Sequence, residues 1–358
     1  MGTPLAAVLL TERGASPATV GLYAATGWVA AILSAPCTPW FAARLGGALA
    51  LHRAAGLASA MVLLGLATNP PFWVWFVLSP LLGAASCLTW TTADAIAGAL
   101  APPGREGRFL GIYQTFVSAA IGGGPAMLWL TGVRPAAFAG CAALMGSGFL
   151  LTLWLREVPG ATPRRMRLSI PRLRPVLLMM RAPAGAAMLC GGLESIAGAV
   201  FPVQGLALGM SAAAAASIVV ATGFGNMLSQ MPVGWAADRF GAHRAVLGCA
   251  IAVAVGALAW PLWAPGWAVW PVLAVWGGAA GSIYTLGMVR AVQRFAGPAR
   301  AMGMASLNTA YLLGGAIGAP MGGLLLETLP GWGLPAVIAT VALAAGAGLA
   351  WAALRRGG

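Results

Sequence analysis

The sequence predicts an all-α polytopic membrane protein with two six-helix halves, and three observations support this prediction. Of the 358 residues, 60% are hydrophobic and only 8% are charged, which is too little polar surface for a domain that folds in water. The apolar residues form segments of about 20 to 25 residues, the length of a membrane-spanning helix. A basic stretch near the middle separates these segments into two groups, as expected for two helical halves joined at one membrane surface.

The first group of segments predicts five full spans and an incomplete first helix. Residues 1–11 are apolar, but as a helix they would extend only about 16 Å, roughly half of the hydrocarbon core. We therefore interpret them as the stub of a first helix. Turn-forming glycines and prolines between the apolar runs delimit full spans at 17–42, 46–68, 72–100, 107–131 and 134–156.

The basic stretch from Arg156 to Arg181 contains seven of the 20 basic residues, together with several prolines that break a continuous helix. The predicted organisation is an N-terminal half over residues 1–156, a linker over 157–180 and a C-terminal half over 181–358. It comprises eleven full transmembrane helices plus the stub. The six spans after the linker are predicted at 181–208, 211–237, 243–264, 267–293, 298–327 and 332–355.

The arginines predict how the helices are oriented. When the loops are assigned alternately to the two sides, 18 of the 20 arginines fall on the side of the linker, and only Arg13 and Arg134 fall opposite. This asymmetry predicts a multi-pass protein of the cytoplasmic (inner) membrane, with the linker and the C-terminus in the cytoplasm. Tryptophans near the opposite ends of the spans are expected to anchor the helices at the membrane interface: Trp73, Trp75, Trp260, Trp263, Trp267, Trp270 and Trp332.

Composition argues against several other functions. The chain has a net charge of +13, but its basic residues lie between apolar segments rather than on one folded surface. Nucleic acid is therefore not expected as a partner. The five cysteines are widely spaced inside apolar segments, and His52 and His243 are predicted in loops beside arginines, so no disulfide framework, metal site or cofactor is expected. The rival class, an intramembrane enzyme, lacks an intramembrane His, a Cys near a His, a His-Glu-x-x-His motif and a phosphate loop.

The two halves repeat each other with a period of about 190 to 195 residues. The run Trp40-Phe-Ala-Ala-Arg44-Leu-Gly46 ends one span of the first half, and Trp235-Ala-Ala-Asp238-Arg239-Phe-Gly241 ends one of the second. Six spans pair with six only if the stub represents a first helix. We therefore infer an N-terminus that is truncated or begins too late, with a true eleven-span protein as the alternative.

The run Gly234-Trp-Ala-Ala-Asp238-Arg239-Phe-Gly241-Ala-His243-Arg244 resembles the cytoplasmic loop signature of the major facilitator superfamily, except that Ala242 replaces the first basic residue of its tail. The copy in the first half is weaker, because Ala43 stands where the signature has Asp. The Gly-Pro-rich runs at 121–125 and 318–323 are loosely similar to a pattern of the family's antiporters. The resemblance covers essentially the whole chain and is to small, mostly uncharacterised bacterial permeases.

In that family the first, fourth, seventh and tenth helices line a central cavity, which directs attention to two carboxylates inside spans. Glu194 belongs to the seventh helix and lies about 20 Å along it, near the bilayer midplane. A charge there costs at least ~2.5 kcal/mol, so it is a functional candidate by default. With small neighbours and no basic residue within two turns, Glu194 is predicted to bind and release the coupling proton. The alternative is a permanently protonated carboxyl that hydrogen-bonds a neighbouring helix.

Asp94, on the fourth helix, is the second candidate. It shares a helical face with Trp90 and Thr91, but it is close enough to the end of its span to pair with Arg105 or Arg108 in a purely structural role. Other polar residues in the spans are predicted to line the cavity or to form hydrogen bonds between helices: Gln114, Ser118, Thr222, Asn226, Gln230, Tyr284, Asn308 and Tyr311.

The loop signature predicts a gate on the cytoplasmic side. Through the resemblance, and because the repeat pairs the fourth span with the tenth, Asp238 is expected to form a partly buried ion pair with Arg290. The alternative is a solvated loop of charges. The predicted gating residues are Gly234, Asp238, Arg239, Gly241, Arg244 and Arg290.

These observations predict a secondary active transporter that moves a small solute by alternating access around a midplane cavity. Proton coupling through Glu194 is predicted, with efflux by antiport favoured over uptake. The expected partners are the solute, protons and the lipid bilayer, and the expected oligomeric state is a monomer. The alternatives are an intramembrane enzyme or a non-functional truncated permease.

Overall fold

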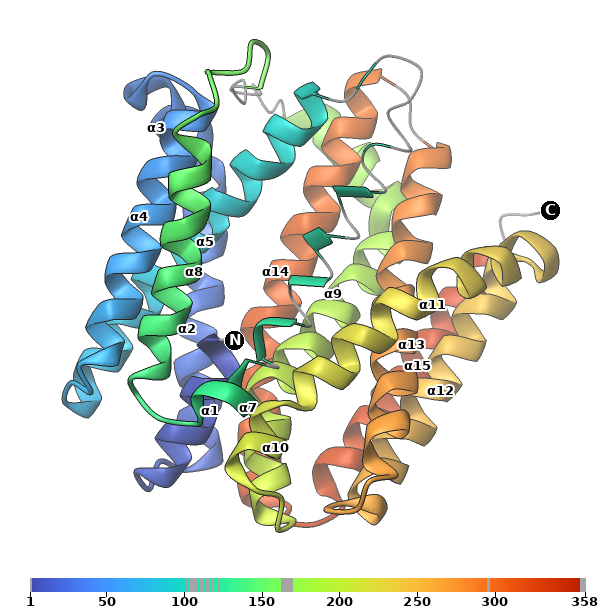
Figure 1. Ribbon diagram of the computed structural model, residues 1–358. Coiled ribbons are helices and arrows are strands. Elements are labelled where there is room, and N and C mark those ends of the chain that lie inside the picture. The colour runs from blue at the N-terminus through green and yellow to red at the C-terminus, as the bar shows by residue number, and fades with distance from the viewer. Residues whose placement is uncertain are drawn as a thin grey trace.

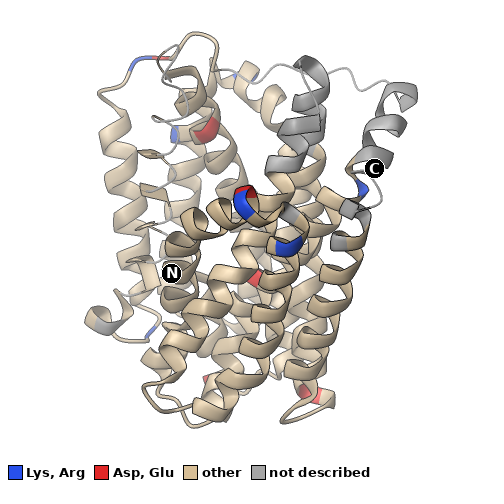
Figure 2. Cartoon of the chain, turned by 90° about the vertical axis from the view of Figure 1, so that its right-hand side faces the viewer, with Lys and Arg blue, Asp and Glu red and all other residues tan. Residues whose placement is uncertain are grey.

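The computed structural model describes residues 2–100, 102, 109, 112–113, 116–117, 119–120, 123–125, 127–161, 170–294 and 297–354. Within these ranges the chain is helical and contains no strand, and the long helices lie side by side in one bundle (Figure 1). Eight described helical segments are long and apolar enough to cross a membrane. Charged side chains are sparse along them (Figure 2), as hydrocarbon requires. The predicted all-α membrane fold is therefore confirmed.

In the first half, most helices begin and end within a few residues of the predicted spans. The span predicted at 17–42 is interrupted after Ser34 by a 3-10 turn, because Pro36 and Pro39 cannot donate the hydrogen bonds of a continuous α-helix. The span predicted at 107–131 lies largely outside the described residues. The described helices are α1 (Gly2–Glu12), α2 (Pro17–Ser34), η1 (Ala35–Cys37), α3 (Thr38–Leu45), α4 (Ala48–Ala67), α5 (Phe72–Leu100), α7 (Leu128–Thr131) and α8 (Ala137–Thr152).

The second half corrects the prediction for the linker. The helix that contains Glu194 begins at Ile170, so the last part of the predicted linker is helical and continuous with the seventh span. Pro171 is tolerated because the first turn of a helix needs no N–H donor. The described helices are α9 (Ile170–Ala207), α10 (Ala212–Ala216), α11 (Ile218–Phe240), α12 (Ala242–Trp263), α13 (Val269–Arg294), α14 (Gly297–Thr328) and α15 (Gly333–Leu354).

The predicted stub is a core element of the bundle. Its helix, α1, packs against α9, and the side chains of Leu5, Val8 and Leu10 are fully buried. A helix that is buried on all sides needs no amphipathic pattern, which is consistent with its uniformly apolar sequence.

Two of the tryptophans predicted as interface anchors are instead buried in the core. Trp75 is fully buried, its indole N–H donates to the carbonyl of Pro70 at 3.2 Å, and the guanidinium of Arg13 lies 4.8 Å from its ring. Trp260 is also fully buried and packs on Phe201, with ring centroids 5.0 Å apart. The anchoring prediction was wrong for these two, because position near a span end does not tell which face of the helix a residue occupies. The exposed members of the set are Trp73, Trp263, Trp267 and Trp332.

The first and second halves meet through α14, which packs on both α9 and α2. A Cβ atom on Gly21 of α2 would overlap the carbonyl of Ala319, so the two backbones touch at this point. We call the end of the bundle that holds residues 153–161 the linker end (upper in Figure 1) and the other the opposite end. The contacts of α2 with α14 extend from the opposite end toward the middle of the bundle. The structure is thus a state in which the halves are closed together at the opposite end.

Two carboxylates hold helix N-termini, where the helix dipole favours a negative charge. At the linker end, Glu157 accepts a hydrogen bond from the amide of Leu49 in the first turn of α4, at 3.1 Å. At the opposite end, Glu327 of α14 accepts one from the amide of Ala18 in the first turn of α2, also at 3.1 Å. The second contact joins the two halves directly.

Replacing Glu327 by Ala should shift the protein toward a state that is open at the opposite end. The contact between the Glu327 carboxylate and the N-terminus of α2 is exposed and contributes up to about 1 kcal/mol. Its loss should therefore change the ratio of open to closed protein by up to about fivefold. The shift can be measured as a longer distance between spin labels placed at Gly14 and Leu329. Glu12→Ala, which removes another exposed carboxylate at the same end, is the control and should leave the distance distribution unchanged. An unchanged distribution in the Glu327 variant would show that this contact does not hold the halves together.

Candidate functional site

Glu194 lies near the middle of the apolar stretch Met180–Ala207 of α9, the depth that its sequence position predicted. Its carboxyl group accepts a hydrogen bond from the phenol of Tyr311 on α14. The thiol of Cys190, one turn earlier on α9, donates to the other carboxyl oxygen at 3.7 Å. Glu194 is only partly buried, so part of its surface faces open space.

Glycines bring α9 and α14 close enough for this hydrogen bond. A Cβ atom on Gly191 would overlap the carbonyl oxygen of Tyr311, and one on Gly314 would overlap the carbonyl oxygen of Met188. Only residues without a side chain permit such backbone contact, which is common where helices cross in membranes. The crossing therefore holds Tyr311 of α14 against Gly191, which lies one helical turn before Glu194 on α9.

Aromatic rings from two further helices surround Tyr311. Trp28 of α2 packs edge to face against it with ring centroids 5.7 Å apart and an interplanar angle of 71°. Tyr284 of α13 does so at 5.5 Å and 66°. We call these three residues, together with Cys190 and Glu194, the Glu194 cluster. It draws on α2 from the first half and on α9, α13 and α14 from the second.

Asp94 lies on α5 and is exposed. Its carboxylate accepts a hydrogen bond of 2.8 Å from the phenol of Tyr113, which lies in the partly described segment between α5 and α7, and the side chain of Trp90 also interacts with it. Tyr284, whose ring packs against Tyr311, lies within electrostatic range of both Asp94 and Glu194. Arg105 and Arg108, the predicted structural partners of Asp94, lie outside the described residues.

Several predicted lining residues use their polar groups within or between helices. The amide of Gln230 donates to the side-chain oxygen of Asn226 at 2.5 Å, and Thr285 of α13 donates to Gln230 at 2.6 Å. For Gln230 this is the interhelical hydrogen bonding that was the alternative to lining a cavity, whereas Asn226 is bonded within α11. The hydroxyls of Thr91 and Thr222 donate to carbonyls of their own helices. Asn308 is exposed on α14, while Gln114 and Ser118 lie outside the described residues.

The gating signature forms the end of a helix rather than a loop. Asp238 and Arg239 lie in the last turn of α11, which Gly241 ends with a φ of 86°. The first-half copy ends in the same way at Gly46, with a φ of 93°. Asp238 is exposed, contrary to the partly buried position that we predicted, and the side chain of its predicted partner Arg290 lies outside the described set. Gly234 is inside α11 with open space around it.

The signature also builds the same stacking contact in both halves. The guanidinium of Arg239 lies 5.6 Å from the ring of Trp235, one turn earlier on the helix, and that of Arg44 lies 4.7 Å from the ring of Trp40. Such cation–π contacts stabilise a helix end by about 0.5–1 kcal/mol when exposed. The shared part of the signature is therefore explained by the helix end itself.

Both histidines lie in helices, not in the predicted loops. His52 is in α4, with Nδ1 3.1 Å from both the carbonyl oxygen of Thr89 and the hydroxyl of Thr92. His243 is in the first turn of α12. The loop prediction was wrong because both residues lie inside the predicted spans 46–68 and 243–264, whose helices begin at Ala48 and Ala242.

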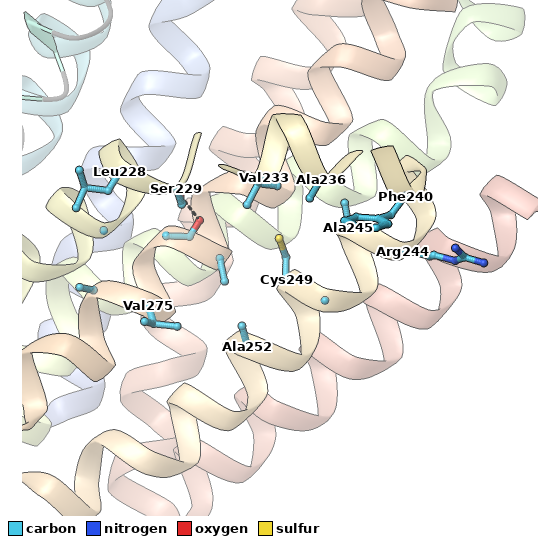
Figure 3. Close-up of a pocket in the computed structure, with 15 residues that line it drawn as sticks. Leu228, Ser229, Val233, Ala236, Phe240, Arg244, Ala245, Cys249, Ala252 and Val275 are labelled. Carbon is cyan, nitrogen blue, oxygen red and sulfur yellow. Dashed lines mark hydrogen bonds between the residues drawn. The ribbon is translucent and has the colours of Figure 1, made fainter. Parts of the chain in front are cut away.

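An apolar cavity of about 650 Å³ lies between α11, α12 and α13 (Figure 3). Leu228 and Val233 of α11 and Ala252 of α12 line it, and Arg244 lies at its edge. None of its lining residues belongs to the Glu194 cluster. The cavity follows from the divergence of α11 and α12 on either side of Gly241, and we assign it no role in solute binding.

Sequence reasoning missed two members of the site. Trp28 lies in the middle of its span, away from the interfaces where an anchoring indole belongs, and this position is the signal that points to it. Tyr113 stands directly before Gln114, but nothing in the sequence relates it to Asp94, nineteen residues earlier. Contacts of this kind depend on how helices cross.

The sequence matches the profile of the Major Facilitator Superfamily twice, over residues 1–184 and over residues 183–357. It is 25% identical over 338 residues to the uncharacterized MFS-type transporter YfkF of Bacillus subtilis (strain 168), covering 91% of this chain and 84% of that protein. The fold is similar to that of the nucleoside transporter NupG, with 15% identity, a TM-score of 0.75 and coverage of 99% and 93% of the two chains. It is also similar to a D-xylose-proton symporter, with 16% identity, a TM-score of 0.73 and coverage of 97% and 92%. The profile matches span the chain, which therefore belongs to the Major Facilitator Superfamily of membrane transporters.

Proposed function

We propose that this protein is a proton-coupled transporter of a small solute, with Glu194 as the proton-binding group and antiport as the direction of coupling. The hydrogen bond between Glu194 and Tyr311 is the observation that carries the proposal. An ionised Glu194 only accepts hydrogen bonds, whereas a protonated one must also donate. The pattern of hydrogen bonds that Glu194 forms between α9 and α14 therefore depends on whether a proton is bound.

The position of Tyr311 supports a link between this proton and the conformation of the protein. Tyr311 is on α14, the helix that packs against both α9 and α2, and its ring contacts Trp28 of the first half. A change at Glu194 thus acts on an element that joins the two halves, as coupling requires. Pro320 lies inside α14 and interrupts its backbone hydrogen bonds, which supports bending of this helix during the cycle.

Transport by the purified protein in proteoliposomes with an internal pH dye tests the proposed function. A panel of metabolites and drugs is added under an imposed pH gradient, and the antiported solute should change the internal pH only in vesicles that contain the protein. A protonophore, which collapses the gradient, should abolish accumulation of that solute. Accumulation that is unaffected by the protonophore would overturn proton coupling, and the absence of transport for the whole panel would count against the proposal itself.

The orientation in the membrane is also a proposal, based on the excess of arginines at the linker end. Green fluorescent protein fused after Gly358 should fluoresce and alkaline phosphatase at the same place should be inactive, because basic ends of spans stay in the cytoplasm. The same two reporters fused after Pro71, at the opposite end, are the matched control and should give the reverse result. Phosphatase activity after Gly358 would contradict the orientation.

We also propose that Asp238 pairs with Arg290 when the linker end closes. Replacing Asp238 by Asn leaves the arginine without its partner and should favour the state that is open at the linker end. Because Asp238 is exposed, the pair is worth at most about 1 kcal/mol, a factor of about five in population. Distances between spin labels at Leu45 and Leu247 measure the shift. Asp238→Glu, which keeps the charge, should behave like the unmodified protein, and identical distances in all three proteins would indicate a solvated charge.

A further inference from the structure

We propose that the Glu194 cluster binds an organic cation with an apolar body, such as an aromatic quaternary ammonium or phosphonium ion, as the transported solute. This inference rests on the proposed function, because it assigns a substrate class to the same site. Three features of the site support it: two carboxylates that pair with no basic side chain among the described residues, aromatic rings, and, in the same part of the chain, a scarcity of polar groups that are available to a neutral solute.

The electrostatics of the region favour a positive charge. Among the described side chains, Glu194 is hydrogen-bonded by Tyr311 and Cys190, and Asp94 by Tyr113, so neither carboxylate forms an ion pair within that part of the chain. Tyr284, which packs against Tyr311, lies within electrostatic range of both carboxylates. A negative solute would be repelled, while a cation would supply the counter-charge that neutral donors do not provide.

The rings supply the rest of the recognition. Trp28, Tyr284 and Tyr311 come from three helices and form two edge-to-face pairs, with ring centroids 5.7 Å and 5.5 Å apart. Each of the three is only partly buried, as is Glu194, so their surfaces are open to a bound molecule. Aromatic rings attract a cation through their negative faces, with about 2 kcal/mol or more where water is excluded.

A neutral sugar or nucleoside fits the site less well. Such a solute needs several unoccupied donors and acceptors, but the amides of Asn226 and Gln230 are bonded to each other and to Thr285. Close to Glu194, α9 contributes Gly191 and the buried Ala187 and Ala197, which offer no polar side chain. Apart from Asn308, which is exposed on α14, the described side chains around the carboxylate are thus apolar and aromatic.

Proton and cation would then compete for Glu194. The titratable groups that face it are Cys190 on α9, Tyr311 on α14 and Tyr284 on α13, with Asp94 on α5 acting on the same tyrosine. A carboxylate that holds a proton no longer attracts the cation, and a bound cation disfavours the proton. Exclusive binding of two ligands at one group is the requirement for exchange, which agrees with antiport.

Equilibrium binding to the purified full-length protein in detergent tests this inference without any gradient. Radiolabelled tetraphenylphosphonium should bind saturably and be displaced by phenyltrimethylammonium, but not by uridine or xylose. Glu194→Gln should weaken binding about tenfold or more, because the charge is lost while the shape is kept. Glu12→Gln, which removes an exposed carboxylate at the opposite end of the bundle, is the control and should bind normally. Binding to the unmodified protein should also weaken as the pH is lowered.

The outcomes separate the substrate class from the proposed function. Equal binding by the Glu194→Gln variant and the unmodified protein, or displacement by the neutral analogue tetraphenylsilane, would overturn the inference and indicate an apolar site only. If the Glu194→Gln variant does not fold, binding to the unmodified protein that is independent of pH would overturn the inference in the same way. Tetraphenylphosphonium binding with no proton exchange in vesicles would support the ligand class but count against coupling. Proton-driven transport of a neutral solute without tetraphenylphosphonium binding would support proton coupling but overturn the inference about the ligand class.

Discussion

Replacing Glu194 by Gln should abolish accumulation driven by a pH gradient, lowering it by about tenfold or more, while exchange of solute across the membrane continues at solute concentrations high enough to offset the weaker binding. Gln keeps the shape of a protonated Glu and an oxygen that can accept from Tyr311, so the contact between α9 and α14 should persist. It cannot bind or release a proton, so the gradient no longer acts on the transport cycle. Accumulation and exchange are measured side by side in proteoliposomes that contain matched amounts of folded protein.

Two comparisons make this result decisive. Asp94→Asn removes the other carboxylate of the region, which is exposed and bonded to Tyr113, and should reduce accumulation less than the Glu194 change does. Tyr311→Phe keeps the ring against Trp28 but removes the donor, so it should alter the pH dependence of transport rather than abolish it. Normal proton-driven accumulation in the Glu194→Gln variant would remove Glu194 from the coupling mechanism and leave Asp94 as the remaining candidate.

Gly191→Val should strongly destabilise the protein. The new side chain would occupy the space of the Tyr311 carbonyl, and backbone cannot move aside as a flexible side chain can. Overpacking of a tight core typically costs about 1–3 kcal/mol, and a clash with backbone belongs at or above the upper end of that range. The expected result is a lower thermal unfolding midpoint of the purified protein and loss of proton-driven transport.

Gly185→Val on the same helix is the matched control, because a Cβ atom at Gly185 has no neighbour within 4 Å. Its unfolding midpoint should stay close to that of the unmodified protein, which separates the effect of the clash from the general effect of valine in a helix. Equal midpoints for the two variants would mean that α9 and α14 are not in backbone contact at this crossing.

The sequence predicted the described spans well because membrane insertion depends on length and hydropathy, and both are local properties. Counting residues along the span also placed Glu194 near the middle of its apolar stretch. The sequence did not predict the donor that holds it, since Tyr311 is separated from it by 117 positions and their contact depends on the crossing of two helices at Gly191. For the same reason Trp75 and Trp260 looked like anchors, although the bundle places both on inward faces.

Helix boundaries near charged residues were the other source of error. The second part of the basic linker was expected to be irregular because of its prolines, yet α9 begins at Ile170, since prolines near the start of a helix interrupt few hydrogen bonds. Likewise Asp238 was assigned to a loop, whereas a single glycine at 241 is enough to end α11 and begin α12. Charged residues and turn residues indicated roughly where the helices end, but the predicted boundaries differ from the observed ones by several positions.

The contact between Ala18 and Glu327 constrains the order in which the protein is assembled. The two residues are 309 positions apart. At a synthesis rate of about 5–20 residues per second, α14 is therefore synthesised about 15 to 60 s after α2. During that interval the face of α2 that carries Gly21 and Trp28 has no α14 to cover it. The first half must therefore persist in the membrane with an unfinished surface, and the docking of α14 is among the last steps of folding.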